Sequence, residues 1–143
     1  NATASDGYSE EENHFSAELN LKSYSNGMGA MGLPGDWSSQ SRFIRATFAK
    51  MNSKCGDSEK ESVSQFFHIL DSVAFPRGCV EIKPNLFEIT VYSSCCNTNK
   101  GIYYYKTYEN HQISAIHMHN EDLEGQSLIC YPMKTENEIY AIN

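Results

Sequence analysis

Residues 58–73 read SEKESVSQFFHILDSV, and this stretch defines the most clearly predicted element of the chain. Ser58, followed three residues later by Glu61, matches a capping box, which marks the start of an α-helix. Pro76 and Gly78 end the helical pattern. The apolar residues between these signals recur at helical spacing and form one stripe: Val63, Phe66, Phe67, Leu70 and Val73. We therefore predict an amphipathic helix that packs against another layer.

The segments on either side of this helix predict an α+β fold. Residues 38–52 predict a second helix, which Ser38 or Ser39 can cap. Apolar and polar residues alternate over 87–92, which is typical of a strand. Further strands are predicted over 102–108, 112–118 and 127–133, the last of them short. We expect two helices stacked on an antiparallel meander.

Composition restricts the partners and the compartment. The 143 residues carry a net charge of -7, which argues against a nucleic-acid partner. No run of about 18 apolar residues is present, so no membrane-spanning helix and no membrane partner are expected. The five cysteines fit neither a disulfide framework nor the spacing of a zinc site. Free thiols are typical of a reducing compartment, so we expect a cytoplasmic protein.

Two short motifs could indicate a cofactor site or a metal site, but the residues around each of them argue against such a site. Residues 27–32, GMGAMG, satisfy the G-x-G-x-x-G pattern of dinucleotide sites. Polar residues precede the motif and Pro34 follows it, so the required strand and helix are missing from the pattern. His117 and His119 fall on one face of a predicted strand, but no third ligand stands at a convincing spacing. We expect no cofactor and no metal.

Four longer segments resemble a known family. They are GLPGDWSSQSRFIR over 32–45, QFFHIL over 65–70, YSSCC over 92–96 and KGIYYYKTYEN over 100–110. In this order they resemble segments of the choloylglycine hydrolases, which include conjugated bile acid hydrolases and penicillin V acylases. The resemblance runs from about Leu19 to the end of the chain. It implies part of the αββα sandwich of an N-terminal-nucleophile hydrolase.

The resemblance also implies a mechanism and a catalytic residue. In this family an N-terminal cysteine attacks the amide carbonyl while its own amino group acts as the base. Arg42 matches a catalytic position of the family, where a guanidinium near the sulfur favours the thiolate. The cysteine itself and the other catalytic positions would lie before Asn1, so we expect this chain alone to be inactive.

The same resemblance predicts the domain organisation and the substrate. Residues 1–143 would form the C-terminal portion of one choloylglycine hydrolase domain, with residues 1–26 as an extended assembly arm of a homotetramer. The loop over 74–78 matches a family loop at the substrate pocket, where Phe75 and Arg77 would suit an amphipathic anion such as a conjugated bile acid. Penicillin V acylase and a non-catalytic fragment or assembly remnant are the alternatives. We also expect an exposed aromatic sheet face and poor solubility.

Overall fold

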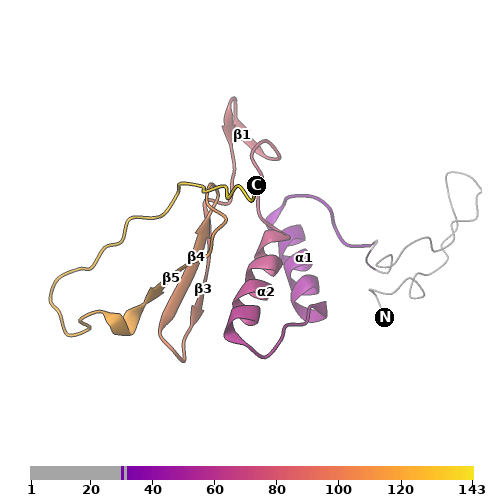
Figure 1. The fold of residues 1–143 in the computed structure, drawn as a ribbon. Coiled ribbons are helices and arrows are strands. Elements are labelled where there is room, and N and C mark those ends of the chain that lie inside the picture. Colours follow the sequence, from indigo (N-terminus) through magenta and orange to yellow (C-terminus); the bar gives the residue numbers. More distant parts are fainter. Residues whose placement is uncertain (1–29, 31) are drawn as a thin grey trace, which may run out of the picture. The chain divides into compact units, whose positions relative to one another are not determined.

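The computed structural model describes residue 30 and residues 32–143, and the chain divides into two compact units, residues 1–52 and residues 53–143 (Figure 1). The predicted assembly arm, residues 1–26, lies outside the described residues. Most of the glycine motif over 27–32 does as well.

The described part of the first unit is one helix and the loop before it. Helix α1 spans Ser39–Asn52, which confirms the helix predicted from the sequence. Ser38 caps it, because its hydroxyl accepts a hydrogen bond from the backbone N–H of Ser41 at 3.3 Å. At the other end, the side-chain amide of Asn52 donates to the carbonyl of Phe48 at 2.8 Å.

Helix α2 of the second unit spans Glu59–Asp71 and carries the predicted capping box. The Ser58 hydroxyl accepts from the backbone N–H of Glu61 at 3.2 Å, and the Glu61 carboxylate accepts from the backbone N–H of Ser58 at 3.2 Å. The Ser58 hydroxyl also donates to the Glu61 carboxylate at 2.5 Å, and this bond, followed by the one from the Ser58 backbone N–H, lowers the pKa of Glu61. Phe67, from the apolar stripe, is only 3% exposed. Val73 is also buried, at 7% exposure, but Phe66 of the same predicted stripe is 42% exposed. The sequence therefore predicted the start of α2, and its buried face only in part.

An antiparallel meander follows, in the order β3-β4-β5. Its strands are β3 (Tyr92–Asn97), β4 (Ile102–Thr107) and β5 (Ser114–His117). Tyr104, in the central strand, lies opposite Cys95 of β3 and Ala115 of β5. A short 3₁₀ turn, η3 (Met118–Asn120), comes directly after β5.

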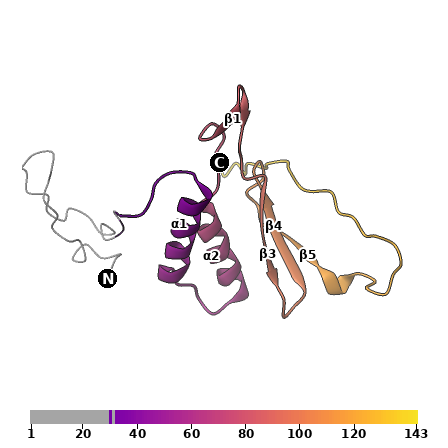
Figure 2. The same cartoon turned by 180° about the vertical axis from the view of Figure 1, so that it is seen from behind.

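Helix α2 packs against the β3–β4 side of this sheet, as the two opposite views show (Figures 1 and 2). Lys106 of β4 pairs with Asp71 at the end of the helix, with 2.5 Å between Nζ and Oδ1. Its ammonium also lies 5.6 Å from the ring centroid of Phe67. Since residues two apart in a strand share a face, Tyr104 and Lys106 both point to α2. This is an α+β arrangement, as predicted.

The sequence predicted one strand over 87–92, and this prediction is wrong. The structure has a two-stranded hairpin instead, β1 (Glu81–Lys83) with β2 (Leu86–Phe87), and β3 begins only at Tyr92. Residues 88–91 form isolated backbone bonds to separate segments, such as Thr90 N–H to the carbonyl of Phe75 at 3.3 Å. Alternating apolar residues produced the strand pattern, but no single neighbouring strand pairs with them.

The short strand predicted over 127–133 is also absent, and residues 121–143 contain neither helix nor strand. This C-terminal segment is tied to β4 at Lys134. The backbone N–H of Lys134 donates to the Tyr105 hydroxyl at 3.4 Å, and its carbonyl accepts from the Thr107 hydroxyl at 3.0 Å. Side chains therefore hold the segment without a backbone ladder.

Candidate functional site

Arg42 lies in the first turn of α1 and is half-buried. Its backbone N–H donates to the carbonyl of Ser38 at 2.9 Å, which is the first hydrogen bond of the helix. The position of Arg42 along the helix axis is therefore set by the cap at Ser38. The family motif over 32–45 thus corresponds to one local structure, a loop and the helix that follows it.

The Asp36 carboxylate is hydrogen-bonded to the residues of this cap. Its carboxylate accepts the backbone N–H of Ser38 at 2.9 Å and the hydroxyl of Ser41 at 2.5 Å. Hydrogen bonding from Ser38, followed by that from Ser41, holds the pKa of Asp36 well below its ordinary value of 3.8. A permanent negative charge at the N-terminus of α1 also suits the helix dipole.

The predicted substrate loop, residues 74–78, belongs to the second unit and is anchored on both sides. The backbone N–H of Phe75 donates to the hydroxyl of Thr90 at 2.8 Å. The backbone N–H of Arg77 donates to the hydroxyl of Tyr108 at 2.9 Å, and the Arg77 guanidinium lies 5.8 Å from that ring's centroid. Phe75 is 6% exposed whereas Arg77 is exposed. The loop therefore combines the buried apolar side chain of Phe75 with the exposed cation of Arg77.

A cleft of about 560 Å³ opens beside this loop. The loop residues Ala74, Phe75 and Pro76 form one wall. The remaining wall residues come from the end of α2, from β3 and β4, and from the segments beside them: Asp71, Thr90, Ser93, Lys106, Thr107, Tyr108 and His111. Its volume lies within the usual range for a small-molecule site.

The cleft combines an apolar wall with cationic groups. Lys106 lines the cleft, is paired with Asp71, and has a side chain that is 14% exposed. His111 lies on the wall and is exposed. Arg77 stacks on Tyr108, which lines the cleft. Such a combination suits an amphipathic ligand that carries one negative charge.

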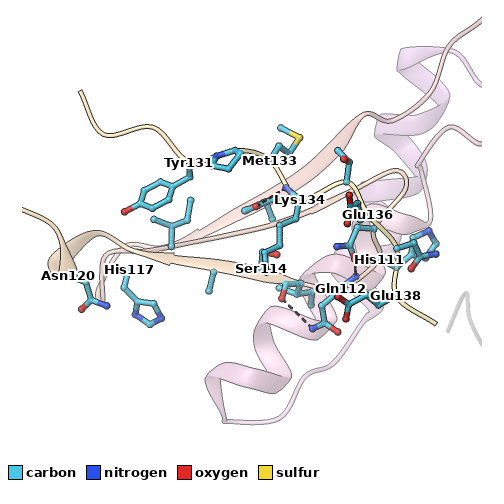
Figure 3. A pocket seen from close by; sticks show the side chains of 18 of the residues that line it. His111, Gln112, Ser114, His117, Asn120, Tyr131, Met133, Lys134, Glu136 and Glu138 are labelled. Carbon is cyan, nitrogen blue, oxygen red and sulfur yellow. Dashed lines mark hydrogen bonds between the residues drawn. The ribbon is translucent and has the colours of Figure 1, made fainter. Parts of the chain in front are cut away.

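A larger cleft of about 1060 Å³ lies between the β5 side of the sheet and the C-terminal segment (Figure 3). Ser114 and His117 come from β5, and Tyr131, Met133 and Lys134 from the C-terminal segment. A short hydrogen bond from the Tyr131 hydroxyl to Glu121 ties this segment to the turn after β5, and it raises the pKa of Tyr131. The walls mix charges of both signs and contain no cysteine.

No metal-binding group of three or more His, Cys, Asp or Glu side chains occurs in residues 30 and 32–143. His119 instead packs against the β3–β4 turn, where a Cβ built on Gly101 would lie 2.8 Å from its Nε2. No helix in the described part of the chain is long and apolar enough to cross a membrane.

The predicted site residues fall in both units. Phe75 and Arg77 belong to one anchored loop beside the smaller cleft, whereas Arg42 lies in α1 of the first unit. Sequence analysis missed Lys106 and His111 as cleft residues. The period of two along β4 offered a signal for Lys106, because it places this residue on the face of Tyr104. The position of His111, in the loop before β5, depends on tertiary folding.

Comparison with known proteins gives one family. The family model of linear amide C-N hydrolases, choloylglycine hydrolase family, matches residues 4–131. The bile salt hydrolase/transferase of Lactiplantibacillus plantarum is 51% identical over 132 residues, which are 92% of this chain and 41% of that protein. The bile salt hydrolase/transferase of Clostridium perfringens is 39% identical over 88% of this chain and 38% of that protein.

Solved structures agree with these relatives. A cysteine-to-alanine variant of the conjugated bile acid hydrolase from Clostridium perfringens superposes with a TM-score of 0.76 at 37% identity, over 95% of this chain and 41% of that chain. Penicillin V acylase from Agrobacterium tumefaciens superposes with a TM-score of 0.53 at 21% identity over 64% of this chain and 29% of that chain, which shows a shared fold alone. The chain thus spans about two fifths of the length of the curated relatives it matches.

Proposed function

Because the chain belongs to the choloylglycine hydrolase family of linear amide C-N hydrolases, we propose that it supplies part of an enzyme that hydrolyses bile acids conjugated with glycine or taurine. The observation that carries this proposal is the 51% identity to the Lactiplantibacillus plantarum bile salt hydrolase/transferase. The relative from Clostridium perfringens bears the same name, which supports a bile salt over other amides.

The proposed nucleophile is an N-terminal cysteine that is not among these 143 residues. Its thiolate attacks the amide carbonyl, the C–N bond breaks, and the departing amine takes a proton from the cysteine's own ammonium group. Water then attacks the thioester, releases the bile acid and restores the thiol. Within the chain, burial raises the pKa of the Cys95 thiol, and the adjacent Cys96 adds to the effect. A raised pKa is the opposite of what a nucleophilic cysteine requires.

Arg42 is the residue proposed to act on that nucleophile. A guanidinium stays charged in a half-buried place, and a cation beside sulfur favours the thiolate. Its support is its position in the matched motif together with the fixed first turn that carries it.

Phe75 and Arg77 are proposed to contact the substrate. The apolar wall beside Phe75 suits the steroid body, and Arg77 at the surface suits the carboxylate or sulfonate of the conjugate. Lys106, which lines the cleft, adds a second cation whose charge Asp71 largely balances. This assignment makes the 74–78 loop a determinant of affinity more than of the chemical step.

The proposal extends to the whole protein. Residues 1–143 would form the C-terminal portion of a single domain in a cytoplasmic homotetramer, with residues 1–26 reaching a neighbouring subunit. Without the N-terminal cysteine the chain alone would be inactive. Penicillin V acylase is the second candidate function, supported by the fold that the chain shares with the Agrobacterium tumefaciens enzyme. A non-catalytic fragment that assembles without turning over amides is the third.

The test uses the chain alone and a hybrid enzyme. In the hybrid, residues 4–131 of this chain replace the matching region of the Lactiplantibacillus plantarum relative. Amine release from glycocholate, taurocholate and penicillin V is then measured. We expect no release by the chain alone and release from at least one bile salt by the hybrid. Arg42→Met should lower kcat by roughly 10²-fold. Lys54→Gln, at an exposed position, is the matched loss of a cation and should leave kcat unchanged.

Three results would count against the proposal. A folded hybrid that cleaves penicillin V but neither bile salt would establish the acylase alternative. A folded hybrid inactive on all three substrates would support the non-catalytic fragment. Full activity of the Arg42→Met hybrid would remove the catalytic role of Arg42 while leaving the family chemistry in place.

A further inference from the structure

The loop before α1 is bound back onto the helix by one side chain. The Nη1 atom of Arg45 donates to the carbonyl of Pro34 at 2.9 Å and to the carbonyl of Asp36 at 2.6 Å. Its guanidinium also lies 5.6 Å from the ring centroid of Trp37. Arg45 therefore crosses from the second turn of the helix to three residues of the loop.

A second set of bonds joins the same loop to the first turn. The Ser38 hydroxyl donates to the Ser41 hydroxyl at 3.0 Å, and the Ser41 hydroxyl donates to the Asp36 carboxylate at 2.5 Å. Ser41 is 7% exposed, so its hydroxyl is shielded from water, whereas Ser38 and Asp36 are exposed. Asp36 is thus held by the cap through its side chain and by Arg45 through its carbonyl.

Arg42 lies between these two attachments. Ser41, the buried end of the first set, precedes it, and Arg45 follows it one helical turn later. Residues three apart in a helix lie on neighbouring faces, so the loop attached to Arg45 passes close to the face that carries Arg42. The attachments tie the loop to the first two turns of α1 on either side of Arg42.

We infer that Arg45, acting through the carbonyls of Pro34 and Asp36, is a positioning residue that sets the direction of Arg42 in the proposed hydrolase. This inference rests on the proposed role of Arg42. Neither carbonyl belongs to a helix or strand ladder, and each accepts a hydrogen bond from Arg45. Loss of Arg45 therefore frees the loop and loosens the first turn.

The first measurement is made on the full 143-residue chain. Hydrogen exchange of the Arg42 backbone amide reports whether the bond to Ser38 stays closed. Arg45→Met, which keeps the apolar stem and removes both donors, should accelerate this exchange about tenfold. Arg45→Lys should give a smaller effect, since an ammonium reaches one carbonyl but does not stack on Trp37 as a planar group does. Lys54→Gln is the control and should change nothing.

The second measurement uses the hybrid enzyme and follows the pH profile of alkylation of its nucleophilic cysteine. Arg42→Met should raise the apparent pKa of that cysteine by roughly 1. Arg45→Met should raise it by roughly half as much. The double variant should have the same apparent cysteine pKa as Arg42→Met alone, because Arg45 acts on the cysteine only through Arg42.

The outcomes separate the inference from the function it rests on. If Arg42→Met moves the alkylation profile and Arg45→Met or Arg45→Lys lowers only the melting temperature, then Arg45 merely stabilises the loop and the inference is wrong while the function stands. If Arg42→Met leaves the profile unmoved, the role of Arg42 and the inference fall together. Unchanged Arg42 exchange in Arg45→Met would also overturn the inference.

Discussion

Three side chains from the β3–β4 hairpin converge on Glu59, the first residue of α2. Asn97 donates to it through a short hydrogen bond, Lys100 pairs with it at 2.6 Å, and the Tyr104 hydroxyl donates to it at 3.0 Å. Lys100 contributes most to lowering the pKa of Glu59, followed by Asn97 and Tyr104. Burial, and then the bond to Glu59, raises the pKa of Tyr104. One charge thus joins the start of the helix to the turn of the hairpin.

Glu59→Gln should weaken this junction because all three partners are donors that favour a carboxylate. At pH 7 we expect the melting temperature to fall by about 4 °C. The pKa of Glu59 is lowered in the folded chain, so its charge stabilises the fold above its ordinary pKa of 4.5 and this contribution is lost as the pH falls below 4.5. Thermal unfolding across this range tests the sign. The difference between wild type and Glu59→Gln should shrink on acidification.

Glu109→Gln, at an exposed position of the β4–β5 connection, is the matched loss of a carboxylate. It should leave the melting temperature within the error of the measurement. Equal melting of all three proteins at pH 7 would show that the contacts of Glu59 contribute nothing to stability.

Single residues of the candidate site could be predicted from sequence only where a local motif or a family segment contained them. The loop that carries Phe75 and Arg77 was such a case, and its role in binding substrate stays a prediction. Lys106 and His111 reach the same cleft from more than thirty residues away in sequence, counted from Phe75. Periodicity gives the face of a residue but not the segment that this face meets.

The helices show why some elements could be predicted closely. Caps are local, so the Ser58–Glu61 box and Ser38 located the starts of α2 and α1 from a few residues each. Strands depend on a partner. Residues 88–91 and 127–133 have strand-like composition, yet they belong to no strand ladder. Strands β4 and β5 were predicted more closely, over 102–108 and 112–118, whereas β3 shares only Tyr92 with the strand predicted over 87–92.

Gly101, in the turn between β3 and β4, has two reasons to be glycine. Its φ of 63° lies in the left-handed region, and a Cβ there would lie 2.8 Å from Nε2 of His119. Gly101→Ala should therefore destabilise the hairpin by about 1–2 kcal/mol, as measured by urea unfolding. Asn adopts the left-handed conformation more readily, so Gly101→Asn separates the backbone effect from the contact with His119.

Gly35→Ala is the control, because a Cβ at Gly35 meets nothing within 4 Å. It should change the free energy of unfolding by less than about 0.5 kcal/mol. If Gly101→Ala were as stable as Gly35→Ala, neither the turn conformation nor the His119 contact would constrain position 101.

The apolar residues of the described chain are distributed unevenly. The buried ones all belong to the second unit: Phe67, Val73, Phe75, Ile102 and Tyr105. None of the large side chains in the described residues is less than 2% exposed. By contrast, Tyr92 on the sheet is 51% exposed, and Ile139 and Ile142 of the C-terminal segment are 91% and 100% exposed. Apolar area that stays in water contributes nothing to stability and favours association.

We therefore predict that the 143-residue chain associates in solution through this exposed apolar surface. Sedimentation should give an average mass that exceeds one chain and rises with concentration, and a dye that binds apolar surface should fluoresce with the folded chain. Replacing Ile139 and Ile142 together by Ser removes two of the most exposed apolar side chains and should lower the average mass. Thr135→Ser, in the same segment, is the control. A monodisperse monomer that melts in one cooperative transition would contradict the prediction, because its apolar surface would then be covered within a single chain.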